Sequence, residues 1–214
     1  MGLLKTFEQW NRHLFLVLNG PAAPSPLMLN FADIVAGKLI FVIPVILAWL
    51  WLRGDPARRS GLLMAFIAAE IALLINQIIP IFWVHPRPFM IPIGHTYLPH
   101  VADSSFPSDH VTFICAIAAG LVCWKGAPKA GWGIGLMAFP VAWARIYLGV
   151  HFPADMVGAV FVAGIVVLFC WPLFPPLQSV LFPNYIDPLY QRLFAYPIAK
   201  RWTSDQPPVP TPDK

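Results

Sequence analysis

Apolar residues occur along this chain in long runs separated by short polar segments. Five mostly apolar windows span about 30–52, 60–84, 108–124, 131–149 and 153–175. A membrane-spanning helix needs about 20 such residues, and each window meets or approaches that length, although the third and fourth are short. The pattern therefore predicts an all-α membrane bundle of five transmembrane helices.

The two ends of the chain have a different pattern. Residues 6–19 alternate polar and apolar groups, which predicts an amphipathic helix lying in the membrane interface. A sixth, very short span there is the alternative. From about residue 176 the chain is rich in proline and aromatic residues, and residues 203–214 have the composition of a disordered tail. Residues 1–202 are expected to form one membrane-embedded domain.

The composition supports a membrane protein. Hydrophobic residues make up 58% of the 214 residues and charged residues only 11%, against about 25% charged in a typical soluble domain. The net charge of +4 is not accompanied by a basic run with interleaved aromatic residues, so nucleic acid is not an expected partner. The three cysteines, Cys115, Cys123 and Cys170, lie inside apolar runs and are expected to be free thiols.

The basic residues predict the orientation of the helices. They gather in two turns and in the tail, at Arg53, Arg58, Arg59, Lys125, Lys129, Arg192, Lys200, Arg201 and Lys214. The positive-inside rule places these segments in the cytoplasm. The loop 85–107 and the segment 145–155 then face the other side, and their only Lys or Arg residues are Arg87 and Arg145.

Three polar clusters are expected on that outer face. They are HPRPF at 85–89, SSFPSDH at 104–110 and RIYLGVHFPAD at 145–155. Each lies where a predicted span begins or ends, so a five-span topology brings all three to one membrane depth. The clusters are far apart in sequence, and together they predict one functional site.

The residue types in these clusters suit phosphate chemistry. Arg87 and Arg145 can form bidentate, charge-assisted hydrogen bonds to phosphate oxygens. Ser108 and the backbone amides that begin the third span add donors for an anion.

Two histidines and an aspartate complete the set. His110 and His151 lie on different segments and suit a general acid and a nucleophile. Asp155 follows His151 by one helical turn, so its carboxylate can hold the imidazole N–H and fix the tautomer. The set predicts phosphoryl transfer through a phosphohistidine, with the arginines supplying charge stabilisation and with neither metal nor cofactor.

The motifs HPRP, PSDH and R-x5-H-x3-D resemble the three signature motifs of the type-2 phosphatidic acid phosphatase superfamily, which also includes vanadium haloperoxidases. The resemblance covers about residues 85–155 and the general pattern of spans. It implies that His151 is the nucleophile with Asp155 as its partner, and that His110 protonates the leaving group. It also implies that Arg87, Arg145 and Ser108 bind the phosphate.

This chain departs from the family pattern at three positions. Pro80 stands where the first motif has a lysine, Asp109 replaces the glycine of PSGH, and Ala144 replaces the serine before Arg145. The form NQ…FxxHPRPF followed by FPSDH is most similar to bacitracin-resistance-type undecaprenyl pyrophosphate phosphatases. The resemblance implies a polyprenyl diphosphate substrate in the bacterial inner membrane, with the active site facing the periplasm or exterior. Asp109 is a candidate for interaction with the second phosphate.

Other polar residues have a structural and a functional interpretation. Pro88 and His85, in the first motif, are included among the substrate-binding candidates, although His85 could equally lie at the membrane interface. His95 and His100 are expected to be solvent-facing or lid residues of the loop 85–107, and a zinc site formed by them with Asp103 lacks a distinctive spacing. Asn76 and Gln77 could link helices or extend toward the site.

Lys38 and Glu70 fall inside predicted spans, where a charge is costly unless it is paired or functional. Counting along the antiparallel first two spans puts them at similar depth, which favours an ion pair. Asp33 is an alternative partner for Lys38, and Lys38 could instead replace the lysine missing at position 80.

Two alternative functions share these sequence features. The substrate could be another lipid phosphate, such as phosphatidylglycerophosphate, phosphatidate or lipid A, or the phosphoryl group could pass to another lipid. The chain could also be a small anion transporter, but its motif residues are expected at one face of the bilayer rather than across it.

Overall fold

The computed structural model describes residues 2–124, 126–199 and 203, and the elements within them are helical. In chain order these are α1 Gly2–Leu18, α2 Pro26–Asp33, η1 Ile34–Lys38, η2 Leu39–Phe41, α3 Val42–Arg53, α4 Pro56–Phe82, η3 Pro88–Met90, α5 Asp109–Cys123, α6 Pro128–Tyr147, α7 Pro153–Leu181, η4 Phe182–Ile186, α8 Asp187–Leu193 and α9 Ala195–Ala199. Each of the five predicted windows corresponds to a helical segment. The all-α membrane bundle is confirmed.

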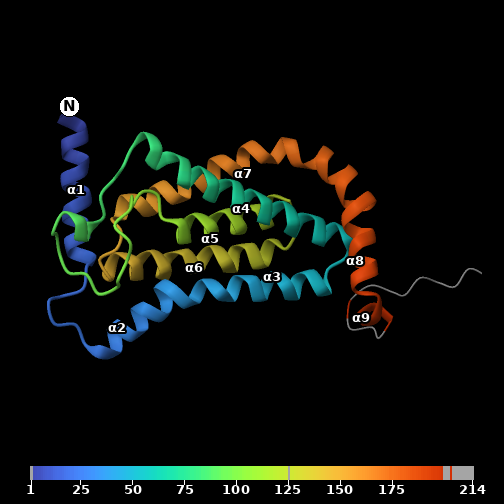
Figure 1. Cartoon of the computed structure of the whole chain (residues 1–214), viewed down its shortest axis with the longest axis horizontal. Coiled ribbons are helices and arrows are strands. Elements are labelled where there is room, and N and C mark those ends of the chain that lie inside the picture. Colours follow the sequence, from blue (N-terminus) through green and yellow to red (C-terminus); the bar gives the residue numbers. More distant parts are fainter. Residues whose placement is uncertain (1, 125, 200–202, 204–214) are drawn as a thin grey trace, which may run out of the picture.

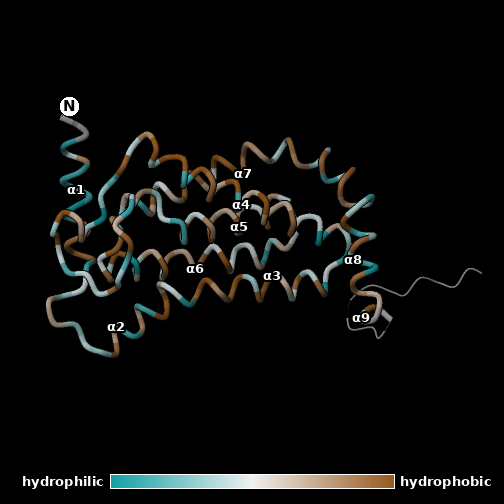
Figure 2. The backbone as a smooth tube through the Cα atoms, viewed as in Figure 1, coloured by the Kyte–Doolittle hydropathy of each residue, from teal (hydrophilic) through white to brown (hydrophobic). Residues whose placement is uncertain are grey.

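The helices form a bundle with α5 at its centre (Figure 1). Helix α5 packs against α4, α6 and α7, and α3 packs along α4. Helices α1 and α8 cross opposite ends of the bundle, as the interfacial prediction for α1 requires. Hydrophobic residues extend along the bundle helices, and hydrophilic residues gather toward its two ends (Figure 2).

Three helical segments are long and apolar enough to cross a membrane within the part of the chain that the structure describes. They are Pro26–Arg53, Pro56–Phe82 and Pro153–Leu193. The apolar helix α5 has only 15 residues and packs between α4, α6 and α7. The chain is therefore a multi-pass membrane protein, and five crossings remain the prediction.

The first span is not one regular helix. A π-helical turn, Ile34–Lys38, and a 3₁₀ turn, Leu39–Phe41, separate α2 from α3. Pro44 explains part of this irregularity, because it has no N–H to donate to the carbonyl of Ile40 and its ring crowds that carbonyl. The irregular turn faces α6, where the carbonyl of Ala36 accepts a hydrogen bond from Arg145.

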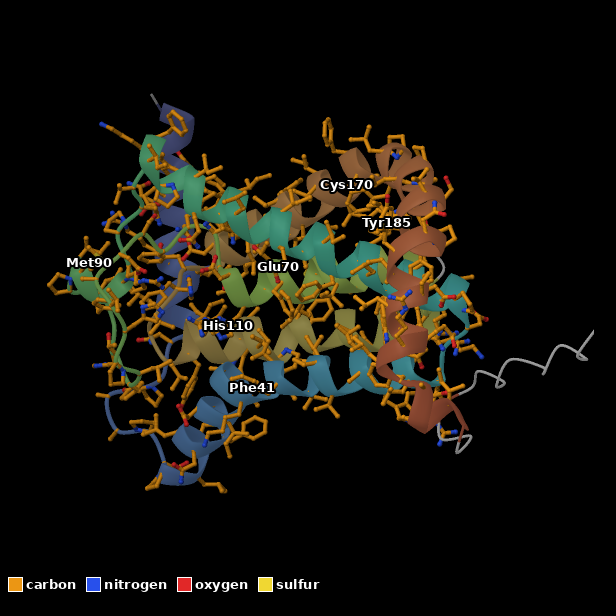
Figure 3. The ribbon with its side chains drawn as sticks, turned by 45° about the vertical axis from the view of Figure 1, so that its right-hand side comes forward. Phe41, Glu70, Met90, His110, Cys170 and Tyr185 are labelled. Atoms are coloured by element: carbon orange, nitrogen blue, oxygen red, sulfur yellow. The ribbon has the colours of Figure 1, made fainter. Side chains whose placement is uncertain are left out.

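The expected ion pair between Lys38 and Glu70 is wrong. Both residues are exposed, and no ion pair among the described residues joins Lys38 to Glu70 or to Asp33. The reason is lateral position, since η1 packs against α6 whereas Glu70 lies on α4 (Figure 3). Counting residues along two spans estimates their depth but not which helices are neighbours.

The C-terminal part of the chain is more helical than its composition indicated. Helix α7 contains Pro172, Pro175 and Pro176 and still continues to Leu181, followed by η4 and α8. Buried Arg59 holds α8 in place, with Nη1 3.6 Å from Asp187 and its guanidinium 3.8 Å above the ring of Tyr190. The predicted disordered tail, 203–214, lies outside the described residues except for Thr203.

Small residues allow the central helices to approach closely. Ala65, Ala68, Ala69 and Ala72 on α4 are fully buried, and a Cβ added to Gly120 of α5 would lie 2.7 Å from both Cα and Cβ of Ala65. Because lipid chains are as apolar as side chains, close van der Waals packing is a main source of attraction between membrane helices.

We expect Gly120→Ala to lower the free energy of unfolding by about 1–3 kcal/mol, because the added methyl group overpacks the α4–α5 contact. Thermal unfolding in detergent would measure the change. The matched control is Gly164→Ala on α7, where an added Cβ meets nothing within 4 Å. Equal melting temperatures for the two variants would contradict this account of the packing.

Candidate active site

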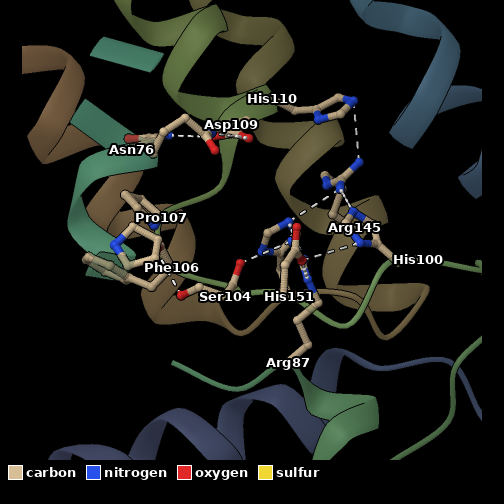
Figure 4. Close-up of a pocket in the computed structure, with 13 residues that line it drawn as sticks. Asn76, Arg87, His100, Ser104, Phe106, Pro107, Asp109, His110, Arg145 and His151 are labelled. Atoms are coloured by element: carbon tan, nitrogen blue, oxygen red, sulfur yellow. Dashed lines mark hydrogen bonds and ion pairs between the residues drawn. The ribbon is translucent and has the colours of Figure 1, made fainter. Parts of the chain in front are cut away.

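A pocket of about 240 Å³ lies at the end of the bundle that α1 crosses. Four elements contribute to it: the last turns of α4, the first turn of α5, the last turn of α6 and the segment before α7. The loop between α4 and α5 closes it. Its lining residues are Asn76, Gln77, Pro80, Arg87, His100, Asp103, Ser104, Phe106, Pro107, Asp109, His110, Arg145 and His151 (Figure 4).

His151 and Asp155 form a buried pair. His151 Nδ1 lies 3.2 Å from Asp155 Oδ2, and the backbone N–H of Phe152 donates to the same oxygen at 2.7 Å. Asp155 is fully buried in the first turn of α7, where Pro153 begins the helix. A carboxylate at Nδ1 fixes the proton there, which leaves Nε2 unprotonated.

Two buried guanidinium groups surround that nitrogen. His151 Nε2 lies 3.2 Å from Nη1 of Arg87 and 3.4 Å from Nη2 of Arg145. Burial lowers the pKa of His151 to about 4, and the charges of the two arginines contribute to the decrease despite the opposing effect of Asp155. His151 is therefore neutral near pH 7, as a nitrogen nucleophile must be.

Arg87 is held by oxygen atoms from three directions. Nη1 donates to the carbonyl of Val150 at 2.9 Å, Nη2 donates to the carbonyl of Ser104 at 3.2 Å, and Nε donates to Asp103 at 2.7 Å. Pro88 does not line the pocket. It is buried and begins the short turn η3 directly after Arg87, so it fixes the backbone that carries the guanidinium.

Arg145 links both sides of the pocket. Nη1 lies 3.4 Å from His110 Nε2 and also contacts the carbonyl of Ala36, and Nη2 lies 3.4 Å from His100 Nε2. Burial, together with the charges of Arg87 and Arg145, lowers the pKa of His100. The pocket thus combines two fixed positive charges with neutral imidazoles, an arrangement that favours an anion with several oxygens.

Asp109 projects from the first turn of α5 into the same pocket. Asn76 Nδ2 donates to its Oδ1 at 2.8 Å, and Gln77 Nε2 donates to its Oδ2 at 3.3 Å. Asn76 also donates to Thr112 at 3.0 Å. These two amides therefore both link α4 to α5 and line the pocket, so the two interpretations of Asn76 and Gln77 both hold.

The structure places the remaining candidates differently. Ser108 is fully buried at the N-cap of α5 and does not line the pocket, and its hydroxyl has no hydrogen-bond partner. His85 lies outside the pocket, with Nδ1 2.8 Å from Ser105 Oγ and 3.5 Å from Asp155 Oδ1.

The loop between α4 and α5 contributes two pocket residues, His100 and Asp103, that the sequence did not predict at the site. The sequence predicts His100 as a solvent-facing or lid residue and offers Asp103 only as a conceivable zinc ligand. In the structure His100 contacts Arg145 and Asp103 contacts Arg87. Among the described residues there is no cluster of three His, Cys, Asp or Glu side chains that could hold a metal ion. The proximity of His100 and Asp103 to the arginines depends on the folded path of the loop, which no local spacing encodes.

Known proteins are similar to this chain in both sequence and fold. An Escherichia coli K12 protein named undecaprenyl-diphosphatase YbjG is 34% identical to this chain, over 92% of this chain and 99% of its own length. The undecaprenyl-diphosphatase BcrC of Bacillus subtilis 168 is 31% identical over 73% of this chain and 80% of its own length.

The crystal structure of Aquifex aeolicus LpxE has the same fold. It matches with a TM-score of 0.59 and 24% identity, covering 75% of this chain and 93% of that one. The family model described as PAP2 superfamily matches residues 60–179, a range that includes all three motifs. This chain belongs to the PAP2 superfamily.

Proposed function

We propose that this protein hydrolyses undecaprenyl diphosphate to undecaprenyl phosphate and inorganic phosphate. The observation that carries the chemistry is the position of His151 Nε2, 3.2 and 3.4 Å from two buried guanidinium groups. The substrate class rests on the two relatives named undecaprenyl-diphosphatases, which match this chain over most of its length.

In the first step, His151 Nε2 attacks the terminal phosphorus. The N–P bond forms while the bond from phosphorus to the bridging oxygen breaks. His110, which takes up a proton when the negative charge of the diphosphate enters the pocket, gives that proton to the departing lipid phosphate. Arg87 and Arg145 bind the phosphoryl oxygens and neutralise the charge that develops on them. The hydroxyl of Ser108, which has no hydrogen-bond partner among the described residues, is proposed to donate to the same group.

In the second step, water attacks the phosphohistidine. The water oxygen bonds to phosphorus, the N–P bond breaks, and His110 accepts the proton of the water. Asp155 holds Nδ1–H throughout, so it stabilises the positive charge that the imidazole gains when Nε2 is phosphorylated. Inorganic phosphate then leaves, and the free histidine is restored.

Asp109 is proposed to distinguish a diphosphate from a monophosphate. Its carboxylate lies in the pocket between two amide donors, at the α4 side rather than beside the arginines. A carboxylate close to a second phosphate accepts its proton in a hydrogen bond, whereas it only repels a fully ionised phosphate.

The pocket is proposed to open at the outer face of the bacterial inner membrane. The basic turns at the opposite end of the bundle support this orientation through the positive-inside rule. The polyprenyl chain would then stay in the bilayer against the apolar helices while its diphosphate enters the pocket.

Purified wild-type protein in detergent is expected to release phosphate from undecaprenyl diphosphate, and His151→Ala is expected to reduce the rate on the order of 10³-fold or more. Phosphate release is the measurement, with phosphatidylglycerophosphate as the comparison lipid. His95→Ala is the matched control, since His95 lies in the loop between α4 and α5 and does not line the pocket. Release only from the comparison lipid would overturn the substrate but keep the nucleophile.

We expect Asp109→Asn to lower kcat/KM for undecaprenyl diphosphate about 10-fold or more, because it removes a proton acceptor. The same variant should hydrolyse a lipid monophosphate at the wild-type rate or faster, because the repulsion by the carboxylate is removed. The ratio of the two rates is the measurement, and equal losses on both substrates would rule out discrimination by Asp109.

A further inference from the structure

Hydrogen bonds from the described residues reach one oxygen of the Asp155 carboxylate and not the other. Oδ2 accepts from His151 Nδ1 and from the backbone of Phe152, whereas Oδ1 is buried without a hydrogen-bond partner. A buried carboxylate oxygen that lacks a partner is costly, and more so when the group is charged. The ion-pair partner on this side is His85, whose Nδ1 lies 3.5 Å from Oδ1.

Several contacts fix His85 in this position. Its Nδ1 lies 2.8 Å from Ser105 Oγ, and its backbone N–H donates to Ser104 Oγ. Its ring packs edge-on against Phe152, with centroids 5.5 Å apart, and lies tilted against Trp83, with centroids 5.4 Å apart. The side chain is only 12% exposed. His85 therefore approaches Asp155 from the side opposite the pocket.

The N-terminal helix supplies the next group. Glu8 Oε2 on α1 lies 3.8 Å from His85 Nε2, and Asn11 on the same helix accepts a hydrogen bond from the backbone N–H of Ala154. Glu8 and His85 also line an apolar cavity of about 730 Å³ with Trp83, Phe106 and Phe161. Low polarity around an ion pair strengthens the attraction within it.

Acidic groups lie on both sides of His85. Glu8 on α1 and Asp155 on α7 are the acidic groups that face His85, and Arg12 reaches only Glu8. The loop contributes hydroxyl and aromatic groups. Burial lowers the pKa of His85, but Asp155 and Glu8 together outweigh that effect and raise the pKa above its ordinary value.

We propose that Glu8 and His85 are positioning residues that extend the His151–Asp155 pair into a chain of four groups, so that the interfacial helix α1 forms part of the catalytic apparatus. Protonated His85 keeps Asp155 ionised and stops its carboxylate from rotating away from His151. The Nδ1–H tautomer of His151 is thereby maintained, and Nε2 remains available for attack. This inference rests on the proposed role of His151 as nucleophile.

The kinetic test compares Glu8→Gln, His85→Ala and His85→Lys with wild type, using phosphate release from undecaprenyl diphosphate across pH. His85→Ala should lower kcat on the order of 10-fold or more with little change in KM, because His85 does not line the pocket. His85→Lys should recover part of that loss by restoring the positive charge. Glu8→Gln should move the alkaline limb of kcat to lower pH by about one unit, because His85 then loses its proton more easily.

The matched control is Lys5→Gln, which changes a charge on the same helix at an exposed position and should leave the profile unchanged. Histidine NMR titration of detergent-solubilised wild type and Glu8→Gln tests the inference without turnover. It should show that the pKa of His85 falls in the variant and that His151 keeps Nδ1–H. The same alkaline limb in Glu8→Gln and Lys5→Gln, or an unchanged His85 titration, would overturn the inference. Absence of phosphate release from the wild type would instead refute only the proposed function.

Discussion

The architecture of the site depends on placing two buried guanidinium groups against one imidazole nitrogen. Arg87 and Arg145 repel each other, and burial deprives both of water. The fold offsets these costs with backbone carbonyls, because the carbonyls of Val150, Ser104 and Ala36 all accept from the two arginines. The π-turn of the first span contributes to the site, because it presents the Ala36 carbonyl to Arg145.

The loop between α4 and α5 completes this arrangement because its path is fixed at several points. The amide of Asn19 bonds the backbone of His95 in both directions, and the backbone N–H of Tyr97 donates to Leu148 at 3.0 Å. Gly149 makes the approach possible, since its φ is +80° and an added Cβ would lie 2.1 Å from the carbonyl oxygen of His95. With its backbone anchored, the loop can hold His100 and Asp103 over the arginines. Asp103 lies 2.7 Å from Arg87 Nε and partly neutralises that guanidinium.

The end of the bundle is therefore assembled from segments that are far apart in sequence. Helix α1 reaches the first turn of α7 through Asn11 and reaches the loop through Glu8. Because α1 lies across the bundle end, it contacts both α6 and α7. Helix α1 thus contacts the residues directly behind the site.

The sequence by itself determined the features that depend on local length and spacing. The length of its apolar windows predicted five helical segments, and the four-residue step from His151 to Asp155 predicted their pairing at one helical turn. The convergence of Arg87, His110 and Arg145 followed because each motif lies where a span begins or ends.

Only the tertiary structure decided which side chains face one another at the same depth. It separated Lys38 from Glu70, placed His85 behind Asp155 instead of in the pocket, and buried Ser108 beside it. It also brought Glu8, His100 and Asp103 to the site. The physical reason is that residue spacing fixes position along a helix, whereas lateral packing and the path of a long loop arise from contacts between distant segments.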